Sequence, residues 1–141
     1  MEICCGSGMA TQALQHLGCR PLSMDVDRCD LCLALKSGLM EAKSCFVLDA
    51  RYLTRFFPPR SFQTILGFMV GLIDDFNWPM WREILLHASG LAEKSILFTV
   101  YTRKEAELIA KAMEEAGWKG EVIDNRDKSG IYDQWAYRAI R

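Results

Sequence analysis

The fold is decided close to the N-terminus, by a short apolar run that ends in a glycine turn: Glu2-Ile3-Cys4-Cys5-Gly6-Ser7-Gly8. This run predicts a strand over residues 2–5, and the segment after it predicts a helix over about residues 9–17 that ends at Gly18. Glycines directly after a strand let backbone N–H groups approach a ligand, and the N-terminus of the next helix favours negative charge. A nucleotide-like ligand fits such a turn, although glycine turns are also common in α/β proteins that have no such ligand.

Short apolar runs alternate with amphipathic segments along the rest of the chain, without repeats or a long linker. This order predicts an α/β fold of three layers, with helices on both faces of a mostly parallel sheet and an antiparallel final strand. The expected strands lie at residues 21–24, 44–48, 62–68, 94–101, 118–124 and 134–140, and a polar loop at residues 125–133 joins the last two. The expected helices begin at Asp27, Pro79 and Thr102 and end near Met40, Gly90 and Ala116.

Composition sets the broad class of protein. The chain has 141 residues, the usual length of one domain, and half of them are apolar, so we expect a single folded domain over residues 1–141. The 17 Lys and Arg against 18 Asp and Glu give a net charge of −1, which disfavours nucleic acid as a partner. The longest apolar stretch, residues 64–73, is about half of the ~20 residues that a bilayer span needs. No basic segment leads into an apolar run as in a secretory signal, so we expect a cytoplasmic protein without membrane contact.

Six cysteines lie in the first third of the chain, and a cytoplasmic location would keep them reduced. Cys29 and Cys32 form a C-x-x-C pair on an expected helix, a pattern that occurs in zinc and redox sites. A zinc site needs a second ligand pair, and the two histidines, His16 and His87, lie far apart in the sequence. We therefore expect no metal site and interpret the cysteines as small buried hydrophobic residues.

Aspartates follow the second and third expected strands. Asp25 lies seventeen residues after Gly8, where an acidic side chain can accept hydrogen bonds from two ribose hydroxyls, and Asp27 is a close competitor for that role. Asp49 ends the third strand. Each aspartate could instead cap a helix or a turn. Because parallel strands end at one edge of a sheet, the glycine turn and the two strand-end aspartates are expected to meet there.

With these residues the sequence resembles the class I, Rossmann-like S-adenosylmethionine-dependent methyltransferases, over nearly the whole chain. The resemblance implies that Glu2 lies near the amino group of the methionine moiety, that Asp25 contacts the ribose, and that Asp49 accepts a hydrogen bond from the adenine amino group. Ala50 would offer a backbone N–H. The expected cofactor is S-adenosylmethionine, and the full set of expected cofactor contacts is Glu2, Cys4, Gly6, Ser7, Gly8, Asp25, Val26, Asp49, Ala50 and Phe68.

The sequence departs from this family at three places. Cys4 stands where the family often has glycine, and Met1 directly precedes Glu2, so the central strand is expected to be short. After the fourth strand the family's Asn/Asp-Pro-Pro-aromatic motif is replaced by Gly67-Phe68-Met69-Val70. This replacement disfavours methylation of nucleic bases or glutamine amides. A chain of 141 residues also leaves little material for a substrate lid, so we expect a small-molecule acceptor in a shallow open site, or a partner subunit that completes the site. A short first strand would also expose a sheet edge or apolar surface. We therefore expect a homodimer in which a second copy of the chain covers this surface.

The chemistry expected of such a site is modest. The sulfonium methyl group is already activated, so the protein has to align a nucleophile and exclude water. If the acceptor must lose a proton, the candidate catalytic residues are Asp74 and Tyr101, with Asp75 and His87 as weaker candidates. The expected acceptor-facing residues are Phe68, Met69, Trp78, Tyr101 and Tyr132. Phe68 and Trp78, with Trp81, could equally belong to the core or to a protein interface.

Three other functions compete with this hypothesis. A subunit that binds S-adenosylmethionine without catalysis and works through a protein partner would have the same turn and carboxylates. A nicotinamide-dependent oxidoreductase would need a third glycine, and Thr11 occupies that position. A metal or thiol protein would be built on the clustered cysteines.

Overall fold

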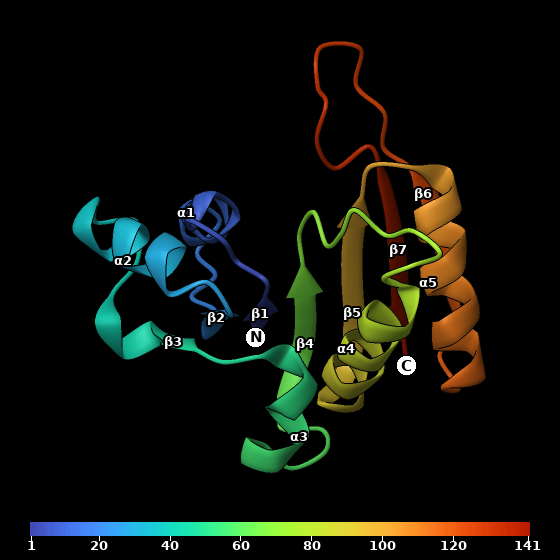
Figure 1. The fold of residues 1–141 in the computed structure, drawn as a ribbon, viewed down its shortest axis with the longest axis horizontal. Helices are drawn as coiled ribbons and strands as arrows, with labels where there is room; N and C mark the ends of the chain where they lie inside the picture. Colours follow the sequence, from blue (N-terminus) through green and yellow to red (C-terminus); the bar gives the residue numbers. More distant parts are fainter.

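Seven strands form one sheet in the order β3-β2-β1-β4-β5-β7-β6, in a computed structural model that describes residues 1–141 (Figure 1). All neighbouring strands pair in parallel except at β7, which runs antiparallel to both β5 and β6. The predicted mostly parallel sheet with an antiparallel final strand is therefore confirmed. The strands are β1 (Glu2–Ile3), β2 (Ser23–Asp25), β3 (Cys45–Val47), β4 (Phe62–Gly67), β5 (Ala92–Val100), β6 (Gly120–Asp124) and β7 (Trp135–Ile140).

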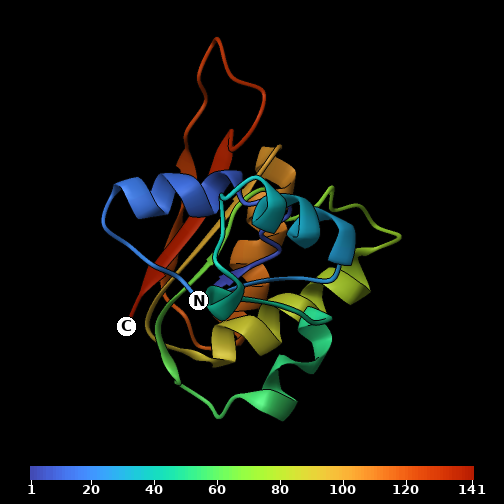
Figure 2. The same cartoon turned by 90° about the vertical axis from the view of Figure 1, so that its left-hand side faces the viewer.

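Helices cover both faces of the sheet, which confirms the predicted three layers. Helices α1 and α2 lie on the side of the sheet opposite α4 and α5 (Figure 2). None of the helices combines the length and the apolar character needed to cross a membrane. The helices are α1 (Met9–His16), α2 (Arg28–Lys36), α3 (Leu53–Phe56), α4 (Trp78–Gly90) and α5 (Arg103–Glu115), with short 3-10 turns η1 (Ala42–Ser44) and η2 (Ala50–Tyr52).

The main core lies around the central strands and the faces of α4 and α5 that pack on them. Phe98 on β5, Ile65 on β4 and Leu85 on α4 are fully buried there, and Trp118 and Tyr137 close the core near β6 and β7. Burial of aromatic and branched side chains on this scale supplies most of the hydrophobic stabilisation of such a fold. The sheet is thereby held rigid beneath the strand ends.

Several predicted bounds shift by one or two residues, and the ends of β1 and α2 differ for a clear reason in the backbone. β1 spans two residues rather than four, because Cys4 has a positive φ of 53° and turns the chain out of the strand. α2 ends at Lys36 rather than near Met40, because Gly38 has a φ of 73° and Leu39 donates a backbone hydrogen bond to the Ala34 carbonyl. This is a glycine-terminated helix end of the Schellman type.

Residues 50–56 form a structured segment that the sequence did not predict. η2 and α3 follow directly after Asp49, and Leu53 anchors them because its side chain is fully buried in the main core. The segment packs against α4, so the chain after β3 is part of the folded body and not a loop. The predicted capping box at the start of α5 is confirmed, since Thr102 and Glu105 exchange both hydrogen bonds.

Candidate functional site

The glycine turn after β1 has the backbone geometry that only small residues tolerate easily. Gly6 and Gly8 have positive φ angles of 50° and 87°, and Gly8 directly precedes α1. A Cβ at Gly8 would lie 3.1 Å from Met40 Cε, so this position also lacks room for a side chain. The turn therefore directs the chain from the end of β1 into the N-terminus of α1.

Asp25 is fixed against this turn from the neighbouring strand. Its Oδ2 accepts a hydrogen bond of 2.8 Å from the Gly6 N–H, and its Oδ1 accepts one of 2.8 Å from the Asp27 N–H. Asp27 itself caps α2, with hydrogen bonds of 2.7 Å from the Cys29 N–H and 3.3 Å from the Asp30 N–H. The structure thus gives the two competing aspartates different roles, and the one beside the glycine turn is Asp25.

Glu2 lies fully buried on β1, beneath α1. Its Oε2 accepts hydrogen bonds from the Thr11 hydroxyl at 2.5 Å and the Ser23 hydroxyl at 2.8 Å, whereas its Oε1 has no partner in the protein. Burial raises the pKa of this carboxyl above its usual range. An unpartnered buried carboxylate oxygen is costly, so a donor from a ligand would satisfy an existing deficit here.

Asp49 follows β3 and begins η2. Its carboxylate accepts a hydrogen bond from the Arg51 backbone N–H at 2.9 Å and is paired with the Arg51 guanidinium, at 2.6 Å from Nη2 to Oδ2. This pairing holds the pKa of Asp49 below its usual range. Sequence reasoning did not identify Arg51, although an arginine two residues after an aspartate at a turn is a detectable signal.

Cys4 directly follows β1, at the sheet edge where these residues lie. Burial, and then the negative charges of Asp25 and Asp49, raise the pKa of Cys4 to about 12. The ends of β1, β2 and β3 meet at a single edge of the sheet, because β2 pairs in parallel with both neighbours and the Leu48 N–H donates to the Asp25 carbonyl oxygen at 3.0 Å. The Gly6 N–H contacts Asp25 at this edge, and Asp49 follows the neighbouring strand β3.

A second group of side chains lies at the ends of β4 and β5. The Met69 N–H donates to the Thr99 hydroxyl at 2.8 Å, and Asp133 in turn accepts from that hydroxyl and donates its N–H to Met69 Sδ at 2.7 Å. These contacts fasten one end of the 125–133 loop, which projects beyond the sheet edge in Figure 1. The Tyr101 and Tyr132 rings pack at 6.1 Å between centroids beside this fastening.

Other candidates have structural roles in the fold. Asp74 Oδ1 accepts backbone hydrogen bonds of 2.9 Å from Phe76 and Asn77, which places it at the start of α4. Asp75 is exposed and pairs with Lys104 at 3.4 Å. The remaining candidates pack inward: Phe68 is half-buried, Trp78 packs against the main core, and His87 Nδ1 lies 2.6 Å from the Arg51 carbonyl oxygen.

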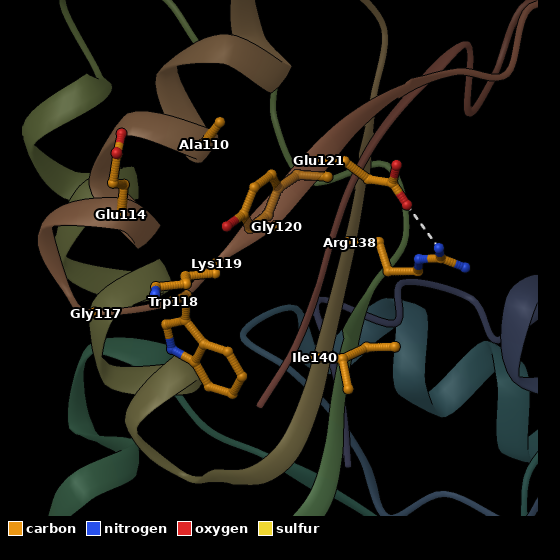
Figure 3. A pocket seen from close by; sticks show the side chains of 10 residues that line it. Ala110, Glu114, Gly117, Trp118, Lys119, Gly120, Glu121, Arg138 and Ile140 are labelled. Carbon is orange, nitrogen blue, oxygen red and sulfur yellow. Dashed lines mark hydrogen bonds and ion pairs between the residues drawn. The ribbon is translucent and has the colours of Figure 1, made fainter.

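A cavity lies away from these residues. Figure 3 shows this open hollow of about 710 Å³ between the end of α5 and the β6–β7 pair, where Trp118, Tyr137 and the ion pair of Arg138 with Glu121 line it. None of the expected site residues borders it. The structure contains no group of three or more His, Cys, Asp or Glu side chains that could hold a metal ion, and Cys29 and Cys32 are free thiols on α2.

Comparison with known proteins gives the fold a name. No protein-family model and no curated protein matches this sequence. Magnesium protoporphyrin IX methyltransferase from Synechocystis PCC 6803, solved with bound SAM, superposes with a TM-score of 0.75 at 13% identity, over 99% of this chain and 68% of its own. A SAM-dependent methyltransferase from Archaeoglobus fulgidus gives 0.70 at 11% identity, over 99% and 84%. One from Mesorhizobium loti gives 0.70 at 11% identity, over 99% and 89%.

Proposed function

We propose that this chain, whose fold is that of the class I S-adenosylmethionine-dependent methyltransferases, binds S-adenosylmethionine (SAM) and transfers its methyl group to a small-molecule acceptor. The observation that carries the proposal is the hydrogen bond of the glycine turn to Asp25, at the sheet edge where the parallel strand β3 also ends before Asp49. Open α/β sheets bind their ligands at the carboxyl ends of the strands, where these groups lie. One fold hosts many functions, so these groups support the proposal independently of the fold.

The groups at this edge fit the separate parts of SAM. A positively charged amino group is the donor that the unpartnered Oε1 of Glu2 lacks. Asp25 is half-buried and accepts two N–H hydrogen bonds, which leaves acceptor positions for the ribose hydroxyls. We assign the methionine part to the turn of Gly6, Ser7 and Gly8. The base would lie beside Val26, Asp49, Ala50 and Phe68.

The work left to the protein is alignment and exclusion of water. When bound, SAM supplies an electrophilic methyl group on a sulfonium centre. We assign Tyr101 to the acceptor side, where its hydroxyl oxygen would accept a hydrogen bond from the nucleophilic O–H or N–H of the acceptor and orient that group, whose proton passes to water as the methyl group is transferred. Asp74 is not assigned to this role, because the two hydrogen bonds that its carboxylate accepts stabilise the start of α4.

A small acceptor agrees with the segments that border the ends of β4 and β5. Met69, Tyr101 and Tyr132 lie together there and offer apolar and aromatic surface, and Tyr132 is 60% exposed. Such side chains suit a flat, partly apolar molecule that can pack against the rings. We therefore propose an aromatic or similarly planar acceptor with one nucleophilic oxygen or nitrogen.

Isothermal titration calorimetry with SAM and S-adenosylhomocysteine tests the binding step. We expect Asp25→Asn to weaken binding by about tenfold or more, because one of its two acceptor oxygens becomes a donor facing N–H groups and ribose hydroxyls. Asp27→Asn is the matched control, since asparagine caps a helix as well as aspartate, and its affinity should stay within about twofold. Failure of the unmodified protein to bind either compound would overturn the proposal.

Methyl transfer is tested separately with radiolabelled SAM and a panel of small aromatic hydroxyl, carboxyl and amine compounds. Incorporation of label that depends on Tyr101 would support the proposed chemistry. Binding of SAM without transfer to any compound would favour the second candidate, a non-catalytic SAM-binding subunit that works through a protein partner. That candidate shares the glycine turn and Asp25, so only the transfer experiment separates the two.

A further inference from the structure

The carboxylate of Asp49 accepts hydrogen bonds from Arg51, a residue of the same turn. Arg51 contributes three donors to it: the backbone N–H at 2.9 Å from Oδ1, Nε at 3.1 and 3.0 Å from the two oxygens, and Nη2 at 2.6 Å from Oδ2. An ionised carboxylate has about four acceptor positions. These four contacts therefore occupy the acceptor positions that Asp49 could offer to a ligand.

The backbone of Arg51 is also held, by a hydrogen bond from α4. His87 on α4 donates from Nδ1 to the Arg51 carbonyl oxygen at 2.6 Å, since a carbonyl can only accept. The next residues of η2 and α3 are anchored by the fully buried Leu53. The guanidinium thus extends from a backbone with contacts of its own, and it meets the Asp49 carboxylate through two donors, Nε and Nη2.

A free carboxylate discriminates between purine bases, whereas a carboxylate paired with arginine does not. A free carboxylate beside a purine accepts a hydrogen bond from a 6-amino group and repels a 6-oxo group, which gives strong preference for adenine. A carboxylate whose acceptor positions are filled makes neither interaction. The neutral pair of Asp49 with Arg51 then leaves the base to be bound by its shape and by stacking.

We propose that Arg51 sets the base specificity of this site by occupying Asp49, so that the site accepts a 6-oxopurine nucleoside about as well as an adenine nucleoside. This inference rests on the proposed function, because it concerns the same nucleoside site. Arg51 acts through Asp49 and is therefore a specificity-determining residue and not a catalytic one.

The test compares S-adenosylhomocysteine with S-inosylhomocysteine, which differ at the 6-position of the base. Calorimetry should give dissociation constants within about threefold of each other for the unmodified protein. In Arg51→Met the carboxylate is released, and the preference for S-adenosylhomocysteine should rise to about tenfold or more. Arg55→Met is the matched control, because Arg55 lies in the next turn and stacks on Tyr52 at 4.8 Å, and it should leave the ratio unchanged.

The outcomes separate the two proposals. If the unmodified protein already prefers S-adenosylhomocysteine by tenfold or more and Arg51→Met keeps that ratio, the inference is wrong while SAM binding stands. If neither compound binds, the proposed function fails and this inference fails with it. If circular dichroism shows that Arg51→Met does not fold, the same ratio of dissociation constants is measured for Arg51→Lys. Lysine keeps the charge but lacks the planar fork, so the adenine preference should rise above that of the unmodified protein.

Discussion

Glu105 and Ile73, 32 residues apart in the chain, are joined by a hydrogen bond of 2.7 Å from the Ile73 N–H to Glu105 Oε1. The other oxygen of the same carboxylate accepts from the Thr102 N–H and hydroxyl, each at 2.7 Å. One buried side chain therefore both caps α5 and holds the segment between β4 and α4. This segment borders the proposed acceptor side, so the capping residue also shapes the site.

Replacement of Glu105 by glutamine should lower the free energy of unfolding by about 1.5–3 kcal/mol, the usual contribution of hydrogen bonds to a charged group. The amide would direct a donor toward N–H groups that need an acceptor. Urea denaturation measures the change. Glu107→Gln is the control, because Glu107 pairs only with the exposed Arg103, and its effect should stay below about 0.5 kcal/mol. Equal effects of the two variants would contradict the role given to Glu105.

Gly67 at the end of β4 has no space for a side chain. A Cβ there would lie 2.7 Å from Val70 Cγ1 and 3.0 Å from Phe98 Cδ1, both of which belong to buried core residues. We expect Gly67→Ala to destabilise the protein by about 1–3 kcal/mol through overpacking. Gly90→Ala at the end of α4 meets no atom within 4 Å and should be neutral or slightly stabilising. Thermal unfolding of both variants checks this contrast. An unchanged Tm of Gly67→Ala would contradict the prediction, because it would show that the neighbouring core residues can shift to accommodate a methyl group.

Glu2 should make stability depend on pH in a defined direction. Burial raises its folded pKa above the ordinary value of 4.5, so its contribution is most favourable below pH 4.5 and is lost as pH rises through the folded pKa. Glu2→Gln removes this titration while glutamine can still accept from Thr11 and Ser23. Its Tm relative to the unmodified protein should therefore increase between pH 4.5 and pH 8. A Tm difference that is constant with pH would contradict the role of this carboxyl. The same variant should bind SAM more weakly, which calorimetry measures.

Cys4 should resist alkylation. Its pKa of about 12 keeps the thiol protonated at pH 8, and the thiolate is the reactive form. Peptide mass spectrometry after timed iodoacetamide treatment should find Cys4 modified far more slowly than the exposed Cys19 and Cys29. Addition of SAM should slow Cys4 further without affecting the other two. Rapid modification of Cys4 in the folded protein would place its thiol outside the site.

The order of elements could be predicted from the sequence because it depends on local signals. The glycine turn, the apolar strand runs and the capping box at Thr102 each occupy a few neighbouring residues, and all three occur where the sequence indicates. Asp25 was also identifiable, since its place at the end of β2 follows from the strand order. These features need no knowledge of distant contacts.

The rest depends on contacts between distant segments or on very short elements. α3 has four residues, too few to show helical periodicity, and it is stabilised by burial of Leu53 in the core. The bond from Ile73 to Glu105 and the placing of Asp133 against Met69 join segments whose pairing no local pattern records. The pairing of Asp49 with Arg51 is local, but it competes with the ligand contact that the family resemblance implies for Asp49.

The position of β7 affects how the protein can fold while it is being made. β7 is the last strand in the chain, yet it lies between β5 and β6 and supplies all of the strand pairing of β6. Until residues 135–140 have been synthesised, β6 has no neighbour and one side of β5 stays open. A ribosome that pauses before this point would hold a nascent chain with β6 unpaired and one edge of β5 open, and such edges are sites for aggregation or chaperone binding.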